Sequence, residues 1–430
     1  MNARGPLGAH HFELVLESVG IAAFPENSPK GTTLPAHSSE FSRGIFHCRK
    51  GLNINALKQH HQVKTMAANI SCIPLLQERD DALDGGIFDR ALSVGLEAIH
   101  FRIDPISGLR AIIAIHNTCR GPALGGTRCL SYPSEHHAII DAMRLAQSMS
   151  YKSAFADLPY GGGKAVLIRP DIIASRDGYF ECYGDFIDSL NGRYITAVDV
   201  GTTVDDMDII GRRTHHVLST SAGSGDPSFH TAQGVLHGIL AAVKVCLNRD
   251  DLEAVRVAIQ GVGKVGYSLA RLLYQQGAEL AVSDINDEAV QRCIDEFGAT
   301  PVDAEKVIDH DCDVLSPCAL GNIINADTVN RMEANIICGS ANNQLAADFY
   351  GDILYRNNIF YVPDYVVNAG GLIHVIYGSS VETEARIASI YDSVADIYQR
   401  SKTLKEPCHR VANQIAEQIL SDSKRIAADV

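Results

Sequence analysis

Positive charge is scarce in this chain of 430 residues. Lysine and arginine together number 37, against 51 aspartates and glutamates, so the formal net charge is −14. A surface that binds nucleic acid broadly needs clustered lysines and arginines. The composition therefore argues against a nucleic-acid-binding protein, but it allows small anionic ligands held by a few local cations.

Long apolar runs and paired cysteines are also missing. No run of about 18 apolar residues occurs, so we expect no membrane span. The eleven cysteines form no Cys-x-x-Cys pair. An odd, scattered set of cysteines in a long chain is typical of reduced thiols and of a cytoplasmic protein. We predict no metal site.

Residues 1–85 lack any sustained helical or strand period. The stretch FPENSPKGTTLPAHSSEFSRG (24–44) is rich in turn-forming residues. No basic segment followed by an apolar core marks a secretory signal, and four glutamates within the first 40 residues weigh against a mitochondrial transit peptide. We predict a disordered extension, with Met66 as a candidate internal start; an unrecognised small domain is the alternative.

From residue 86 the pattern becomes regular. The runs LRAIIAIH (109–116), KAVLI (164–168) and RYITAVDV (193–200) predict buried strands, and PSEHHAIIDAMRLAQSMSYK (133–152) predicts an amphipathic helix. Strands that alternate with helices indicate an α/β fold. We expect a first α/β domain over 86–221.

A second domain is predicted after the polar, glycine-rich break SAGSGDPSFH (221–230). Gly261, Gly263 and Gly266 form G-x-G-x-x-G between a strand and a helix, and Asp284 ends the next strand, 23 residues after Gly261. Such glycines let a pyrophosphate approach a helix N-terminus, and the aspartate accepts from a ribose hydroxyl. We predict a Rossmann NAD-binding domain over 222–370, with NAD favoured over NADP; a nucleotide-free α/β unit is the alternative.

The end of the chain, residues 371–430, is predicted to be helical. In IASIYDSVADIYQR (387–400) the apolar side chains recur at helical spacing. The residues on this face are Ile387, Ile390, Tyr391, Val394 and Ile397.

Two lysines flank a predicted glycine loop. The segment PYGGGKAVL (159–167) does not fit a P-loop, because Pro159 and Ala165 stand where that motif needs glycine and serine or threonine. Lys164 and Lys152 can converge on one pocket, where one binds an anion and the other acts as a base after burial and a cationic neighbour lower its pKa. Asp199, which follows a predicted strand, can share protons with such a lysine. From spacing alone, solvated lysines and a capping aspartate remain the alternative.

Six segments then occur in an order that resembles the Glu/Leu/Phe/Val amino-acid dehydrogenases, most closely the leucine and valine dehydrogenases. The resemblance covers roughly residues 86–430. The segments are GPALGGTR (121–128), MSYKSAFADLPYGGGKAV (149–166), NGRYITAVDVGTTVDDMDII (191–210), SPCALGNIIN (316–325), GSANNQLA (339–346) and PDYVVNAGG (363–371).

The resemblance implies a reaction, a fold and site residues. The reaction is the reversible, NAD-dependent oxidative deamination of an L-amino acid to a 2-oxo acid and ammonium. The fold is a substrate-binding α/β domain, a Rossmann NAD-binding domain and a C-terminal helical segment, with a cleft between domains that closes. The implied roles are Lys164 as the lysine that activates water, Asp199 as the acid–base group that handles the amine and imine protons, Lys152 as the ligand of the substrate carboxylate, and Asn368 as a residue that places the carboxylate or the nicotinamide. Gly125 and Gly126 are implied to let the backbone approach the substrate, and the residues implied near the nicotinamide are Thr231, Cys318, Ala319 and Asn343. A homo-oligomer is implied too.

The substrate is expected to be apolar. Leu124 stands where glutamate-specific relatives carry a lysine that pairs with the side-chain carboxylate, and burying a carboxylate unpaired is costly. Ala197 occupies a place where phenylalanine enzymes tend to have glycine, which favours leucine, valine or isoleucine. Ile387 and Ile390 either line the pocket or belong to the core.

Three other functions remain as alternatives. The first is an aromatic amino-acid dehydrogenase. The second is a catalytically silent NAD-binding regulatory protein, against which the retained set of Lys152, Lys164 and Asp199 argues. The third is a hydroxy-acid dehydrogenase, which needs a catalytic histidine with a carboxylate partner, and no such pair is evident in the motifs.

Overall fold

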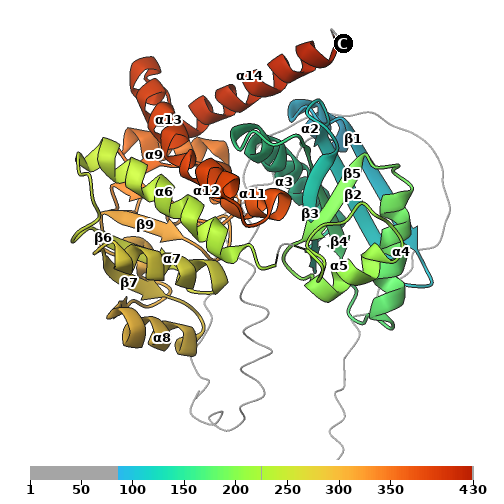
Figure 1. Cartoon of the computed structure of the whole chain (residues 1–430), viewed down its shortest axis with the longest axis horizontal. Coiled ribbons are helices and arrows are strands. Elements are labelled where there is room, and N and C mark those ends of the chain that lie inside the picture. The colour runs from blue at the N-terminus through green and yellow to red at the C-terminus, as the bar shows by residue number, and fades with distance from the viewer. Residues whose placement is uncertain (1–85, 224, 429–430) are drawn as a thin grey trace, which may run out of the picture. The chain divides into compact units, whose positions relative to one another are not determined.

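The computed structural model describes residues 86–223 and 225–428, and the side chains up to residue 425. The predicted extension 1–85 and Met66 lie outside the described residues. In the described part, two sheets are each flanked by helices, which confirms the predicted α/β class (Figure 1). None of the described helices combines the length and the apolar character needed to cross a membrane.

The first sheet is mixed, with strand order β1-β2-β4-β3-β5. Strands β1 and β2 pair antiparallel, as do β2 and β4, whereas β3 runs parallel to both β4 and β5. The elements of this region are α2 (Ile87–Ser93), β1 (Ala98–Asp104), β2 (Leu109–Asn117), β3 (Ala123–Leu130), α3 (Glu135–Phe155), β4 (Gly161–Ile168), α4 (Arg176–Asp188), β5 (Tyr194–Val198) and α5 (Val204–Gly211).

Strand alternation gives this sheet two buried faces. Ile113 and Leu167 pack in one apolar cluster with Tyr183 of α4, whereas Ile112 and Val166 pack in another with Met143 of α3. Successive side chains of a strand point to opposite faces. Residues 164, 166 and 168 of β4 therefore share the face that α3 covers.

The second sheet is entirely parallel, with strand order β11-β10-β9-β6-β7-β8. Its elements are α6 (Ser228–Leu247), β6 (Arg256–Gln260), α7 (Lys264–Gln275), β7 (Glu279–Ser283), α8 (Asp287–Phe297), β8 (Thr300–Pro301), the 3₁₀ helix η3 (Val307–Asp309), β9 (Val314–Pro317), β10 (Ile336–Ile337), α9 (Asp348–Arg356), β11 (Phe360–Tyr361) and α10 (Asp364–Val367).

The C-terminal segment is helical, and its last helix packs on α3 of the first region. Tyr151 of α3 donates to Glu417, at 2.9 Å, and Arg120 donates to Ser423, at 3.1 Å. The helices are α11 (Gly370–Tyr377), α12 (Val381–Ala388), α13 (Ile390–Leu404) and α14 (Cys408–Ala428). The end of the chain thus supports the region in which Lys152 lies.

Two local expectations were wrong. The glycines before Lys164 form no flexible loop: Gly161, Gly162 and Gly163 are the first residues of β4 and pair with β2 and β3. The single helix expected over 387–400 is interrupted at Ser389, so Ile387 ends α12 while the rest of the stretch belongs to α13.

The apolar face of that stretch is nevertheless buried. Ile387, Ile390, Val394 and Ile397 all belong to the main hydrophobic core. Of the two readings for Ile387 and Ile390, the structure supports the core residue. The domain limits at 221 and 370 stay predictions.

Candidate active site

Three charged side chains meet between β3, β4 and α3. Lys164 lies on the face of β4 that α3 covers, because it alternates with Val166. On β3, Thr127 points to Tyr183 of α4, at 2.6 Å, and the next residue, Arg128, points to Asp141 of α3, at 2.8 Å. The pleat therefore brings Lys164 and Arg128 together on one face.

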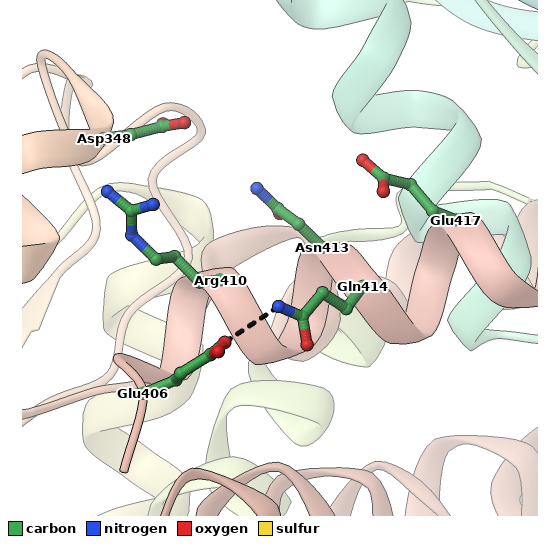
Figure 2. A pocket seen from close by; sticks show the side chains of 6 residues that line it. All are labelled: Asp348, Glu406, Arg410, Asn413, Gln414 and Glu417. Carbon is green, nitrogen blue, oxygen red and sulfur yellow. Dashed lines mark hydrogen bonds between the residues drawn. The ribbon is translucent and has the colours of Figure 1, made fainter. Parts of the chain in front are cut away.

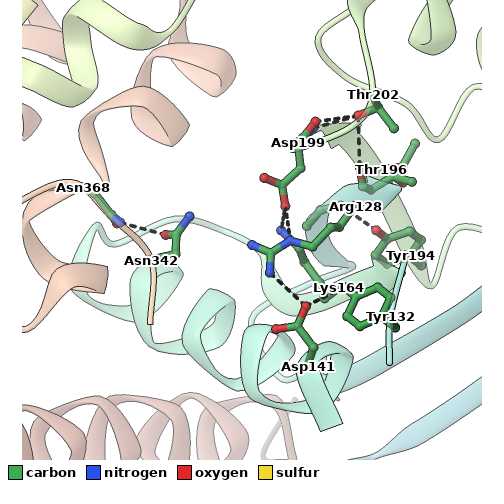
Figure 3. A network of polar contacts seen from close by, with 12 residues as sticks. Arg128, Tyr132, Asp141, Lys164, Tyr194, Thr196, Asp199, Thr202, Asn342 and Asn368 are labelled. Atoms are coloured by element: carbon green, nitrogen blue, oxygen red, sulfur yellow. Dashed lines mark hydrogen bonds and ion pairs between the residues drawn. The ribbon is translucent and has the colours of Figure 1, made fainter. Parts of the chain in front are cut away.

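Asp199 receives both of these cations. It follows the end of β5, where its amide and carbonyl are held by the hydroxyl of Thr202, at 3.0 and 2.9 Å. Its Oδ2 accepts a hydrogen bond from Lys164 Nζ and lies 3.7 Å from Arg128 Nε (Figure 3). The sequence predicts that Asp199 shares protons with one of the two lysines, and in the structure that lysine is Lys164, which forms a buried ion pair with Asp199.

The two partners have displaced pKa values for different reasons. Burial on its own raises the pKa of Asp199, but the charges of Lys164 and Arg128 outweigh it and hold that pKa well below its usual range. Burial lowers the pKa of Lys164; Asp199 opposes this shift, whereas Arg128 adds to it. The carboxylate is therefore ionised, and the lysine loses its proton more readily than a solvated one.

Lys152 is buried without such a partner. It lies in the last turn of α3 with only 9% of its surface exposed, and in the described residues no hydrogen bond or ion pair holds its ammonium. Burial lowers the pKa of Lys152 to about 8, with Asp364 opposing and Lys164 adding to the shift. A buried cation that has no direct ion-pair partner is suited to bind a carboxylate.

Asn368 directly follows α10, after the last strand of the parallel sheet. Its Nδ2 donates to the carbonyl of Ser340, at 3.0 Å, and to Asn342, at 2.8 Å (Figure 3). Its Oδ1 is buried without a hydrogen-bond partner in the described structure. The amide is thus fixed at one end and has an acceptor left over.

The glycines near the lysines have packing reasons. A Cβ on Gly125 would come within 1.7 Å of the Gly163 carbonyl oxygen, and one on Gly126 within 2.8 Å of Asp199 Cβ. A Cβ on Gly162 would come within 2.0 Å of the Ser150 amide of α3. The absent side chains let β3, β4 and α3 approach one another, so the backbone approach predicted for Gly125 and Gly126 is first of all an approach between strands.

The two candidate specificity residues lie beside this cluster. Leu124 and Ala197 lie on the neighbouring strands β3 and β5, where Leu124 pairs with Gly162 and Ala197 with Gly126. Leu124 is fully buried and Ala197 is half-buried. Both positions present apolar groups near Lys164 and Asp199, with no cation of their own.

The glycine-rich turn fits a dinucleotide. Gly261 has a φ of +91°, and a Cβ on Gly266 would come within 1.9 Å of the Gly261 carbonyl oxygen, so both shape the turn. A Cβ on Gly263, the N-cap of α7, would meet nothing within 4 Å. The helix N-terminus is therefore open to an anion.

The ends of the neighbouring strands also present polar groups. Gln260 Oε1 of β6 and Ser283 Oγ of β7 are buried without hydrogen-bond partners in the described structure. Asp284 accepts from the amide of Val262, at 2.7 Å, and from that of Asn286, at 2.9 Å. Asp284 therefore also clamps the glycine turn, and its contact with a ribose stays a prediction.

The four residues predicted near the nicotinamide lie on different elements. Ala319 packs on Gly261, and Cys318 donates its amide to the Gln260 carbonyl, at 2.7 Å, so both adjoin the glycine turn. Thr231 lies in α6 and packs against Gly371 of α11, where an added Cβ would come within 2.3 Å of the Thr231 hydroxyl oxygen. Asn343 accepts from Ser148 of α3, at 3.4 Å, which brings it close to the lysine-bearing helix.

A separate polar cavity of about 430 Å³ opens along α14 (Figure 2). Two of its residues hold tyrosines that adjoin the site in sequence: Glu417 accepts from Tyr151 and Asn413 accepts from Tyr365, at 2.7 Å. The cavity contains no predicted site residue. In the described part of the chain, no group of three or more metal-ligating side chains gathers. The cavity is lined by Asp348, Glu406, Arg410, Asn413, Gln414 and Glu417.

Sequence reasoning missed three polar residues of this site. Arg128 and Asp364 stand inside two of the recognised segments, at the end of GPALGGTR and just after Pro363, but neither was assigned a role. Asp141 lies in the predicted helix. A carboxylate directly before the apolar run of Tyr365, Val366 and Val367 was the available signal for Asp364, which is 5% exposed.

Two buried lysines with a carboxylate, together with a parallel sheet that carries an open glycine turn, fit an amino-acid dehydrogenase, and the comparisons with known proteins show this class. The model of the Glu/Leu/Phe/Val dehydrogenase dimerisation domain matches residues 97–216, and the model of the Glutamate/Leucine/Phenylalanine/Valine dehydrogenases matches residues 284–429. The chain belongs to the Glu/Leu/Phe/Val dehydrogenase family.

Individual relatives agree. A leucine dehydrogenase from Bacillus cereus is 47% identical over 345 residues, which cover 79% of this chain and 94% of that protein. A phenylalanine dehydrogenase from Bacillus thermotolerans is 40% identical over 75% of this chain and 87% of its own. The crystal structure of L-tryptophan dehydrogenase from Nostoc punctiforme superposes with a TM-score of 0.68 at 38% identity, covering 79% of this chain and 99% of that one.

Proposed function

We propose that this protein catalyses the NAD-dependent, reversible oxidative deamination of a branched-chain L-amino acid to the 2-oxo acid, ammonium and NADH. The observation that carries the proposal is the asymmetry of the two buried lysines: Lys164 forms an ion pair with Asp199, whereas Lys152 forms no ion pair or hydrogen bond with a carboxylate of the described residues. A substrate carboxylate supplies the missing anion. The identity of 47% to a leucine dehydrogenase supports the choice of reaction.

The substrate is held by charge at one end and by apolar contact at the other. Lys152 pairs with its carboxylate, and the free acceptor of Asn368 orients the amino group or the nicotinamide amide. Leu124 and Ala197 contact its side chain. A second carboxylate would find no cation at Leu124 and would cost several kcal/mol to bury, so a glutamate-like substrate is rejected.

Lys164 and Asp199 handle the protons. Asp199 is ionised and accepts a proton from the substrate ammonium, which gives the neutral amine that can lose hydride from Cα. Lys164, with its lowered pKa, takes a proton from the water that attacks the resulting imine carbon. Asp199 then returns its proton to the amino group of the carbinolamine, the C–N bond breaks, and the hydroxyl proton passes to the released ammonia, which gives the 2-oxo acid and ammonium.

NAD supplies the hydride acceptor when it is bound. Gly261, Gly263 and Gly266 form the turn for its pyrophosphate, and Thr231, Cys318, Ala319 and Asn343 surround the nicotinamide half. Asp284 carries a negative charge at the end of β7, which disfavours the 2′-phosphate of NADP. This charge supports NAD as the cofactor.

Two further observations bear on assembly and location. The family description of residues 97–216 as a dimerisation domain supports a homo-oligomer. The nine described cysteines are all free thiols, which supports a reducing, cytoplasmic environment.

The test is NADH formation at 340 nm with L-leucine, L-valine, L-isoleucine, L-phenylalanine, L-tryptophan and L-glutamate. We expect turnover on the aliphatic substrates and a loss of roughly 10³-fold or more in Lys164→Ala. The matched control is Lys244→Ala. Lys244 lies on α6 and pairs with Asp250, and this variant should keep its activity. Preference for an aromatic substrate would move the assignment to that class, and absence of turnover with intact NAD binding would favour a regulatory protein.

A further inference from the structure

Arg128 places a second cation beside Asp199, next to the ion pair with Lys164 (Figure 3). Its Nε lies 3.7 Å from Asp199 Oδ2, the same oxygen that accepts from Lys164. Its side chain is 15% exposed, and its Nε is buried without a hydrogen-bond partner in the described structure. A buried donor left unpaired is costly, so this N–H is available to an acceptor that moves toward it.

The other end of the guanidinium is anchored. Arg128 Nη1 donates to Asp141 Oδ2, at 2.8 Å, and the same oxygen accepts from the hydroxyl of Tyr132, at 2.7 Å. Asp141 lies on α3, so the arginine is fixed between the helix and the sheet. This anchor opposes movement of Arg128 toward Asp199.

Lys164 is an impermanent partner for Asp199. In the proposed reaction it alternates between the charged and the neutral form, and it also has to face the substrate. Arginine remains charged at all relevant pH values, and its planar fork can contact two carboxylates at once. When Lys164 is neutral, Arg128 is the remaining cation against Asp199.

We propose that Arg128 is a positioning residue that holds Asp199 in its working orientation while Lys164 exchanges its proton. This role rests on the proposed function. A displacement of Asp199 Oδ2 by about 1 Å toward Nε completes an ordinary hydrogen bond. Asp199 is then retained against the protein rather than drawn toward the substrate cation or the solvent.

The charged and titratable groups that surround Asp199 set the sign of the pH effect. They are Lys164 on β4, Arg128 on β3, Lys152 and Asp141 on α3, and Tyr132 after β3. Arg128 lowers the pKa of both Asp199 and Lys164. Deamination needs Asp199 ionised and Lys164 neutral, so loss of Arg128 moves the activity profile toward higher pH.

The test compares Arg128→Leu, Arg128→Lys and Tyr132→Phe in the full-length protein. We expect Arg128→Leu to lower kcat by about 10²-fold, as a misplaced group does, with a smaller change in the KM for the amino acid and a profile shifted toward higher pH. Arg128→Lys keeps the charge but not the fork, so it should restore the pH profile while kcat stays below wild type. Tyr132→Phe loosens the anchor and should cause a smaller loss in the same direction.

The control is Arg176→Gln. Arg176 of α4 forms a 2.6 Å ion pair with the buried Asp206 of α5, and neither residue contacts Lys152 or Lys164. This variant should lower the melting temperature and leave kcat and the pH profile unchanged. If Arg128→Leu does not fold, the kcat and the pH profile of Arg128→Lys and Tyr132→Phe still test the proposed role of Arg128. Wild-type kcat and pH profile in Arg128→Lys and Tyr132→Phe, or a pH profile in Arg128→Leu that matches Arg176→Gln, would overturn the role. Absence of turnover in the wild type would instead overturn the proposed function.

Discussion

In the mixed sheet β1-β2-β4-β3-β5, charged side chains lie inside the protein, and backbone contacts leave little free space around them. In the parallel sheet, the buried positions of β6, β7 and β9 are apolar except for Ser283 and Ser316, and the proposed ligand contact is made by backbone N–H groups of a glycine turn. The chemistry proposed for the first region therefore depends on ionisable side chains. The cofactor contact proposed for the second depends on glycines, which carry no side chain.

The physical demands of the two tasks explain the difference. Proton transfer needs groups whose pKa can be shifted, and burial beside other charges provides the shift. A pyrophosphate needs several donors at close range, which backbone amides at a helix N-terminus provide without the desolvation cost of a buried lysine. Glycine serves both regions, but for packing in the first and for ligand access in the second.

The largest expected effect separates these two uses of glycine. Gly125→Ala places a Cβ within 1.7 Å of the Gly163 carbonyl oxygen, so β3 and β4 have to separate. We expect a loss of roughly 3 kcal/mol or more in the free energy of unfolding, measured by chemical denaturation. A variant as stable as the wild type would show that the strands have slack at this point.

Lys152 should carry a stability cost for its function. Its pKa of about 8 lies below the ordinary 10.5, so the folded state binds fewer protons than the unfolded state between these pH values, and stability rises with pH over that window. Lys152→Met removes the penalty on the charged form. We expect the variant to be more stable by about 2 kcal/mol at pH 7, and the gain to fade by pH 10.

The same variant should lose affinity for the substrate carboxylate and therefore raise KM. Lys244→Met, on the surface of α6, is the matched control and should show no such pH dependence. A constant difference between Lys152→Met and wild type from pH 7 to pH 10 would contradict the assignment of a lowered pKa.

Gly263→Ala tests the parallel sheet in the same way. Its Cβ meets nothing within 4 Å, so the unfolding free energy should change by less than about 1 kcal/mol. If Gly263 belongs to the proposed pyrophosphate turn, the added methyl crowds the bound cofactor, and we expect the KM for NAD to rise roughly tenfold. If Gly263→Ala does not fold, the expected difference in stability between the Gly125 and Gly263 variants is wrong.

The smallest expected effect is on the choice of cofactor. Asp284→Asn keeps an acceptor for the Val262 amide but removes the negative charge. We expect the ratio of kcat/KM for NADP over NAD to rise severalfold, because the removed charge repels the 2′-phosphate and a partly exposed charge is screened by solvent. Asp284→Ala, which also removes the acceptor, should in addition lower the melting temperature.

Much of this protein could be predicted from local pattern. The spacing of apolar residues identified β2, β5 and α3, and the glycine spacing predicted the turn between the strand β6 and the helix α7. The ordered segments identified the family and the lysine pair. These signals lie within single elements or short units, where period and turn chemistry suffice.

Contacts between distant residues were decided only by the tertiary structure. The sequence did not reveal that Gly161–Gly163 are strand residues, because their conformation is set by pairing with β2 and β3 rather than by propensity. The same pairing register, with strand alternation, selects Lys164 rather than Lys152 as the partner of Asp199 and directs Arg128 to the same carboxylate. The sequence determined which residues are candidates for the site. The tertiary structure determined which of their atoms come into contact, because that depends on how the strands pair.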